Sequence, residues 1–165
     1  MRRPIEQCYW VEPGRLLAGE YPGGRVEYQA QEKVDALLGA GVTTFIDLTE
    51  EHELKPYAHL IGAAAHHRFP IPDLSIPESP ELTARILDAI DRELDREQLV
   101  YVHCWGGVGR TGVIIGCWLA RHGFKGDTAL TRLHELWQRC PKSASRLSPE
   151  TPEQERYVRA WEPGR

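Results

Sequence analysis

The stretch LVYVHCWGGVGRTGVIIGCWLARHG, residues 99–123, constrains the fold more than any other part of the chain. Residues 99–104 form an almost unbroken apolar run, which is typical of a central strand covered on both faces. A glycine-rich turn follows the run, and residues 111–121 after the turn are apolar nearly all round, as in a buried helix. A strand, a tight turn and a helix in this order predict an α/β fold, in which helices cover a mostly parallel sheet.

The remaining sequence continues this alternation of short apolar runs and amphipathic stretches. Residues 15–21 and 42–48 are expected to be strands, and residues 66–72 an extended segment. The helical spacing of apolar residues predicts further helices at 26–38, 79–94, 127–140 and 154–161, with Ser79 and Asp127 as caps. With 165 residues, 41% of them hydrophobic, the chain is expected to form one domain over residues 1–165. Its central sheet should have about 4–5 strands, mostly parallel, with helices on both sides.

The glycine turn has two chemical interpretations. Gly107, Gly109 and Gly112 spell G-x-G-x-x-G, the fingerprint of a dinucleotide site. Such a site needs an acidic residue about twenty positions later, at the end of the next strand. Residues 129–137, ALTRLHELW, occupy that position and are predicted to be helical, which argues against a dinucleotide.

A cradle for a phosphate that is attacked by a cysteine fits more of the residues. Cys104 and Arg110 bracket the loop, which must curl back to begin a helix and so turns its backbone N–H groups inward. A thiol at a helix N-terminus beside an arginine ionises more readily than a free cysteine, so Cys104 is expected to be largely thiolate. The guanidinium of Arg110 can bind two phosphoryl oxygens at once. The residues expected to bind the phosphate are Trp105, Gly106, Gly107, Val108, Gly109 and Arg110, with the glycines allowing close approach of the ligand.

Residues 102–112, VHCWGGVGRTG, match every fixed position of the His-Cys-x-x-Gly-x-x-Arg-Ser/Thr-Gly signature. The chain therefore resembles the cysteine-dependent protein tyrosine phosphatase superfamily. The chain resembles the compact dual-specificity phosphatases in its length and in two segments, FPIPDLSIP (69–77) and SPETPEQERYV (148–158). The resemblance covers roughly residues 42–161. It implies a central, mostly parallel sheet with helices on both sides, a phosphocysteine intermediate and no cofactor.

The resemblance implies that an aspartate on a loop about 30 residues before the cysteine is the general acid, and Asp73 stands there among prolines. The alternative is that Asp73 is an ordinary turn residue. Asp47, near the carboxyl end of the strand predicted at 42–48, is a rival acid. It could instead help to order the cysteine loop.

Four more residues receive expected roles. The resemblance implies that the hydroxyl of Thr111 hydrogen-bonds the sulfur of Cys104 and that Gln154 positions water for hydrolysis. An ordinary helix-start threonine and a solvated glutamine are the alternatives. His103 is expected to brace the loop through backbone hydrogen bonds, the alternative being a satisfied core histidine. Trp105 is expected to pack its ring beneath or beside the pocket.

Composition excludes several classes of protein. The chain has 20 Lys plus Arg against 24 Asp plus Glu and no block of basic residues, which argues against a nucleic-acid partner. No apolar run is long enough for a membrane span, and no apolar segment follows the first arginines, so we expect a cytoplasmic monomer. The four cysteines lie far apart and are expected to be reduced, with Cys117 and Cys140 in the core. The histidines and cysteines lack the spacing of a zinc site, so no metal is expected.

The sequence thus predicts a protein phosphatase that hydrolyses phosphotyrosine in phosphoprotein or phosphopeptide substrates, extending to phosphoserine and phosphothreonine. Hydrolysis of phosphoinositides or RNA 5′-phosphates by the same chemistry is an alternative, although relatives that act on inositides usually carry lysines in the loop and residues 105–109 include none. A phosphate-binding module without catalysis is the third possibility. The presence of Cys104, Arg110 and a candidate acid argues against it.

Overall fold

The apolar run before the glycine loop becomes the central strand of a five-stranded sheet in the computed structural model, which describes residues 1–165. All five residues of this strand, β5 (Leu99–His103), are buried. The strands β2 (Leu16–Gly19) and β3 (Val42–Asp47) pair with β5 in parallel, one on each side. At the edges, β4 (Ala65–Arg68) is parallel to β3, and β1 (Cys8–Glu12) is antiparallel to β2.

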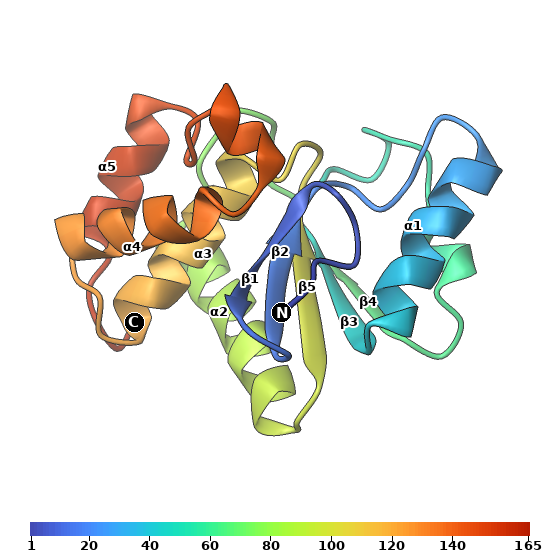
Figure 1. The fold of residues 1–165 in the computed structure, drawn as a ribbon. Coiled ribbons are helices and arrows are strands. Elements are labelled where there is room, and N and C mark those ends of the chain that lie inside the picture. Colours follow the sequence, from blue (N-terminus) through green and yellow to red (C-terminus); the bar gives the residue numbers. More distant parts are fainter.

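Helices cover both faces of this sheet, α1 on one face and the other four on the opposite face (Figure 1). The helices are α1 (Glu27–Gly39), α2 (Pro80–Asp95), α3 (Gly109–Arg121), α4 (Asp127–Trp137) and α5 (Pro152–Ala160), with short 3-10 helices η1 (Ala58–Leu60) and η2 (Pro141–Ala144). Two apolar clusters, of 32 and 13 buried residues, fill the two interfaces. Because β5 is covered on both faces, its sequence is apolar without alternation. The predicted α/β fold is therefore confirmed.

The structure corrects three details of the sequence prediction. Residues 8–12 form the strand β1, which the sequence analysis did not predict. Asp127 does not cap α4, because Gly126 holds the cap position without a side-chain hydrogen bond and Asp127 is the first helical residue. The same helix ends at Trp137, and Cys140 instead precedes Pro141 at the start of η2. By contrast, Ser79 caps α2 as predicted, since its Oγ accepts the N–H of Leu82 at 3.1 Å.

The topology brings the ends of distant segments together at one edge of the sheet. The strands β2, β5 and β3 run parallel, so the residues that follow them, Glu20, Cys104 and Leu48, meet at their common carboxyl end. None of the helices has the length and apolar character that crossing a membrane would require.

Candidate active site

The loop from Cys104 to Gly109 joins β5 to α3. Four of its carbonyl oxygens accept hydrogen bonds from residues outside the loop. The oxygens of Cys104, Trp105, Gly106 and Val108 accept hydrogen bonds from His103 Nδ1 (3.1 Å), Tyr21 N (2.8 Å), Lys142 Nζ (2.9 Å) and Ser148 Oγ (2.7 Å), respectively. In a trans peptide the N–H points away from the carbonyl oxygen. Binding of the carbonyls from outside therefore directs the N–H groups inward, which makes a nest for an anion.

The glycines of this loop serve different purposes. Gly107 has φ +73°, and a Cβ there would lie 2.4 Å from the carbonyl carbon of Gly19 in β2. At Gly106 the nearest atom to such a Cβ would be 3.4 Å away, on Val108. Gly107 is thus required for packing on β2. Its expected role in the close approach of a ligand stays a prediction.

Cys104 lies at the floor of the loop and is 2% exposed. The helix α3 begins at Gly109, and its cap residue Val108 makes no side-chain hydrogen bond to the first turn. The unpaired N–H groups of that turn carry the positive end of the helix dipole. The loop and the helix together favour a negative charge in front of the Cys104 sulfur.

Arg110 is 1% exposed and is oriented by groups from two other loops. Its Nη1 and Nη2 donate to the two oxygens of Glu53 at 2.8 and 2.6 Å, and Nη1 also donates to the Ile71 carbonyl at 2.9 Å. Asp73 Oδ1 lies 3.2 Å from Nη2. The Nε atom is buried and has no hydrogen-bond partner, so it keeps a donor free for an oxyanion.

Glu53 was not predicted as a site residue. It stands 57 positions before Arg110 in the chain, on a segment whose sequence carries no signal of its own. Burial by itself would raise the pKa of Glu53, but the hydrogen bond from Arg110 lowers it below the usual value. The carboxylate therefore stays ionised opposite the guanidinium.

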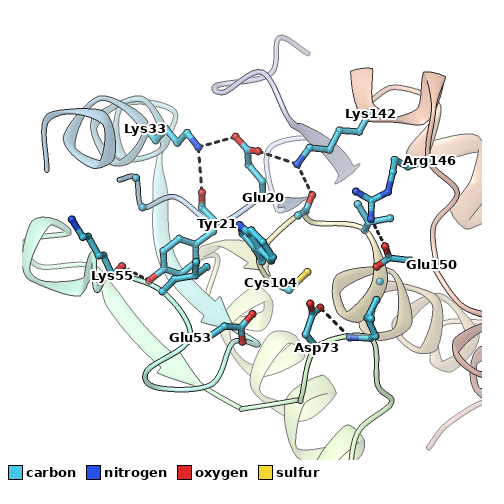
Figure 2. A pocket seen from close by; sticks show the side chains of 18 of the residues that line it. Glu20, Tyr21, Lys33, Glu53, Lys55, Asp73, Cys104, Lys142, Arg146 and Glu150 are labelled. Atoms are coloured by element: carbon cyan, nitrogen blue, oxygen red, sulfur yellow. Dashed lines mark hydrogen bonds and ion pairs between the residues drawn. The ribbon is translucent and has the colours of Figure 1, made fainter. Parts of the chain in front are cut away.

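The structure brings Asp73 to the same cavity as Cys104, as Figure 2 shows. The side chain is about half exposed, and its Oδ1 accepts the N–H of Leu74 in addition to the ion pair with Arg110. A carboxyl group in this place can exchange protons with a group bound at the sulfur and with water.

Asp47, the rival acid, lies outside the cavity and is fully buried. It accepts hydrogen bonds from Thr49 and from His66 (3.0 Å), and forms an ion pair with Arg68 (3.1 Å). Burial alone would raise the pKa of Asp47, but the hydrogen bonds from His66 and Thr49 hold it well below the usual range. Asp47 is thus wrongly placed for a proton donor, and its contacts fit the ordering role.

His103 is fully buried and is hydrogen-bonded at both ring nitrogens. A carbonyl oxygen can only accept, so Nδ1 donates to the carbonyl of Cys104 and Nε2 accepts from the hydroxyl of Tyr57, 2.5 Å away. Burial lowers the pKa of His103 to about 4, which leaves the ring neutral at pH 7. These contacts are those expected of a residue that braces the loop.

The contacts of Thr111 and Gln154 differ from those expected. The Thr111 hydroxyl is buried without any hydrogen-bond partner, so it does not bond the Cys104 sulfur in this structure. Gln154 is buried in the capping box of α5, where its Oε1 accepts the N–H of Thr151 and its Nε2 donates to the Ser75 carbonyl. It is neither solvated nor among the residues that line the cavity. Trp105 lies beside the cavity, which is one of its two expected positions, but its side chain is 58% exposed and does not pack in the core.

The cavity in front of Cys104 has a volume of about 760 Å³. Its basic side chains are Arg25, Lys33, Lys55, Lys142 and Arg146. Its acidic side chains are Glu20, Glu53, Asp73 and Glu150. All four cysteines of the chain are buried free thiols, and burial raises the pKa of Cys117 and of Cys140. Cys117 and Cys140 therefore act as core residues.

Comparison with known proteins places this geometry among phosphatases. Residues 5–158 match the family model described as Swiss Army Knife protein, DSP-PTPase phosphatase domain. The protein 067L of Invertebrate iridescent virus 3, provisionally named a tyrosine phosphatase, is 35% identical over 119 residues, which are 70% of this chain and 47% of the viral protein. The dual specificity protein phosphatase CDC14AB of Danio rerio is 31% identical over 121 residues, 68% of this chain and 19% of the fish protein.

The chain thus spans less than half the length of these two relatives. Among solved structures, Tk-PTP in its active form is similar to this chain with a TM-score of 0.72 at 22% identity, covering 94% of this chain and 96% of that one. At this identity the likeness shows a common fold.

Proposed function

Because this chain belongs to the DSP-PTPase phosphatase domain family of Swiss Army Knife proteins, we propose that it is a cysteine-dependent phosphoric monoester hydrolase. The observation that carries the proposal is the position of the Cys104 sulfur. Cys104 begins the loop that leads into the N-terminus of α3, and it lies close enough to the buried Arg110 for their charges to interact. A phosphoryl group in this nest would have its oxygens bound and its phosphorus in front of a nucleophile.

The first chemical step transfers the phosphoryl group to sulfur. The Cys104 thiolate forms an S–P bond as the P–O bond to the leaving group breaks, and Asp73 donates a proton to the departing oxygen. The loop N–H groups and the free Nε–H of Arg110 stabilise the charge on the remaining phosphoryl oxygens. In the second step water attacks phosphorus, Asp73 accepts its proton, and the S–P bond breaks to release phosphate.

Arg110 also links substrate binding to the acid. Its Nη2 donates to Glu53 and contacts Asp73 in the structure. A bound phosphate dianion competes with Asp73 for this guanidinium, whereas the bidentate contact with Glu53 holds the side chain in place. Asp73 is then released toward the leaving oxygen when the phosphate enters.

Protein phosphotyrosine is the proposed substrate, with phosphoserine and phosphothreonine as further substrates. The names of 067L and CDC14AB support a protein substrate. The exposed ring of Trp105 and the Tyr21 side chain beside the cavity also suit an aromatic leaving group. That the protein is monomeric and cytoplasmic stays a prediction.

Hydrolysis of p-nitrophenyl phosphate in the presence of a chelator tests the proposal. Vanadate should inhibit the turnover, and Cys104→Ser should lower kcat by roughly 10³-fold or more. Cys140→Ala, which removes a thiol outside the cavity, is the matched control and should keep the activity. Turnover that survives in Cys104→Ser would refute the phosphocysteine route, and no turnover in the unaltered protein would leave a binding module.

The role of Asp73 is tested with leaving groups of different basicity. Asp73→Asn should lower kcat/KM, which reports the first step, by about 10²- to 10⁴-fold for phenyl phosphate but much less for p-nitrophenyl phosphate, because nitrophenolate leaves without a proton. Asp95→Asn, an exposed change on α2, is the control. Equal effects on both substrates would remove Asp73 from the acid role.

A further inference from the structure

One wall of the cavity carries more positive charge than its carboxylates balance. Lys33 and Lys142 share a single carboxylate, Glu20, at 2.8 and 3.0 Å. Arg25 and Lys55 form no ion pair with any carboxylate. This cationic wall, defined as Arg25, Lys33, Lys55, Lys142 and Glu20, has four cations against one carboxylate, an excess of three positive charges.

The excess is local, because the whole chain has a formal net charge of −4. Hydrogen bonds also hold the segments of the wall in place. Lys55 Nζ donates to the Arg25 carbonyl at 2.6 Å, and the Tyr21 hydroxyl donates to the Lys55 carbonyl at 2.7 Å. Like charges held together in this way repel one another, and a bound anion relieves the repulsion.

The wall lies to one side of the Cys104 sulfur, and of its cations only Lys142 contacts the loop, through the Gly106 carbonyl. Figure 2 shows Lys33, Glu20 and Lys142 on the side of Cys104 away from Asp73, with Tyr21 between Lys55 and the sulfur. A cavity of about 760 Å³ is large enough for a whole drug-sized ligand, and a phosphate alone would leave most of it empty. The wall is therefore placed to contact the part of the substrate that surrounds the reacting phosphate.

Building on the proposed function, we propose that the cationic wall is a second anion subsite. It binds an acidic side chain that neighbours the phosphotyrosine of a peptide. A peptide fits better than an inositol polyphosphate, whose second phosphate would sit on the same small ring, close to the loop. The only wall cation in contact with the loop is Lys142, and its ammonium is already bound to the Gly106 carbonyl and Glu20. A second phosphate close to the loop would therefore find no free wall cation.

The subsite is tested with two phosphotyrosine peptides that differ only in having glutamate or alanine beside the phosphotyrosine. Calorimetric binding to Cys104→Ser should be about fivefold to tenfold tighter for the glutamate peptide at low salt, since each exposed ion pair contributes modestly. In 0.5 M NaCl the preference should shrink toward one, because exposed charges are screened. Arg25→Gln combined with Lys55→Gln should lower the preference, and Arg156→Gln, an exposed cation on α5 outside the cavity, should not.

Equal binding of the two peptides would overturn the subsite. So would a preference that the double variant leaves unchanged, or tighter binding of an inositol polyphosphate than of the glutamate peptide. Because these measurements need no turnover, they are independent of the p-nitrophenyl phosphate assay. Loss of turnover in that assay refutes the phosphatase, and loss of the peptide preference refutes the subsite.

Discussion

Arg110 is held by Glu53 and by the carbonyl of Ile71, so its guanidinium is oriented before any substrate binds. Such preorganised donors stabilise charge in a transition state without a cost of reorganisation at the moment of reaction. The ion pair is largely buried, because Arg110 is 1% and Glu53 16% exposed. Removing one partner of a buried pair leaves the other charge uncompensated. Glu53 is therefore a positioning residue that acts through Arg110.

Glu53→Gln should lower kcat/KM for p-nitrophenyl phosphate by roughly 10- to 100-fold, because an amide can accept from one Nη group only and lets the guanidinium shift. Vanadate should bind more weakly by a similar factor, and circular dichroism should show the fold retained. Glu51→Gln, an exposed neighbour, serves as control. If both variants behave alike, Glu53 does not position Arg110.

At the scale of elements, the loop between β5 and α3 owes its shape to the segments around it. Gly107 packs against the backbone of Gly19 in β2, and the hydroxyl of Ser148 holds the Val108 carbonyl. A Cβ at Gly112 in α3 would lie 2.3 Å from the same hydroxyl. The loop is thus a part of the core packing, and a change in it affects stability as well as activity.

Gly107→Ala should destabilise the protein by roughly 2–4 kcal/mol, because the added Cβ meets β2 and the positive φ is strained for alanine. Gly106→Ala is a matched change in the same loop that meets neither obstacle, and should cost less than about 1 kcal/mol. Urea unfolding of the two variants measures the difference. Equal losses would mean that the contact with β2 does not hold the loop.

At the scale of the whole molecule, buried polar side chains join the carboxyl ends of three strands beneath the loop. Asp47 at the end of β3 contacts His66 and Arg68 on β4 and lies 4.0 Å from His103 on β5, which also bonds Tyr57. Groups buried in this way bind protons differently in the folded and unfolded states. The free energy of unfolding should therefore depend on pH.

The free energy of unfolding should fall as the pH is lowered from 6.5 to 4. The pKa of His103 is lowered from 6.5 to about 4 by burial, so in this range the unfolded chain binds a proton that the folded protein does not. The loss amounts to about 3 kcal/mol. Below pH 4 the free energy of unfolding drops further, because the fold also lowers the pKa of Asp47. As the pH falls, the Asp47 carboxylate is therefore protonated in the unfolded chain before it is protonated in the folded protein.

Urea unfolding between pH 7.5 and 4 measures this slope, and His103→Gln should flatten it. His52→Gln removes an exposed histidine and should leave the slope unchanged. A free energy of unfolding that stays constant between pH 6.5 and 4 would show that His103 is not held neutral in the fold.

Features set by neighbours in the chain could be predicted from the sequence. The apolar run of β5, the spacing of Cys104 and Arg110 and the cap at Ser79 are of this kind. Each depends on a few adjacent residues, so backbone geometry and hydrophobic periodicity are enough to predict them. Asp73 was singled out by resemblance and proximity in the chain, and the structure places it at Arg110.

Only the tertiary structure decided which distant groups meet. The pairing of Glu53 with Arg110, the packing of Gly107 on β2 and the separation of Asp47 from the cavity all depend on how loops from different strands assemble. The exposure of Trp105 has the same origin, because burial depends on which elements cover a side chain. Contacts across long stretches of chain leave no local pattern in the residues that make them, whereas the loop from Cys104 to Arg110 consists of consecutive residues and can be recognised from them.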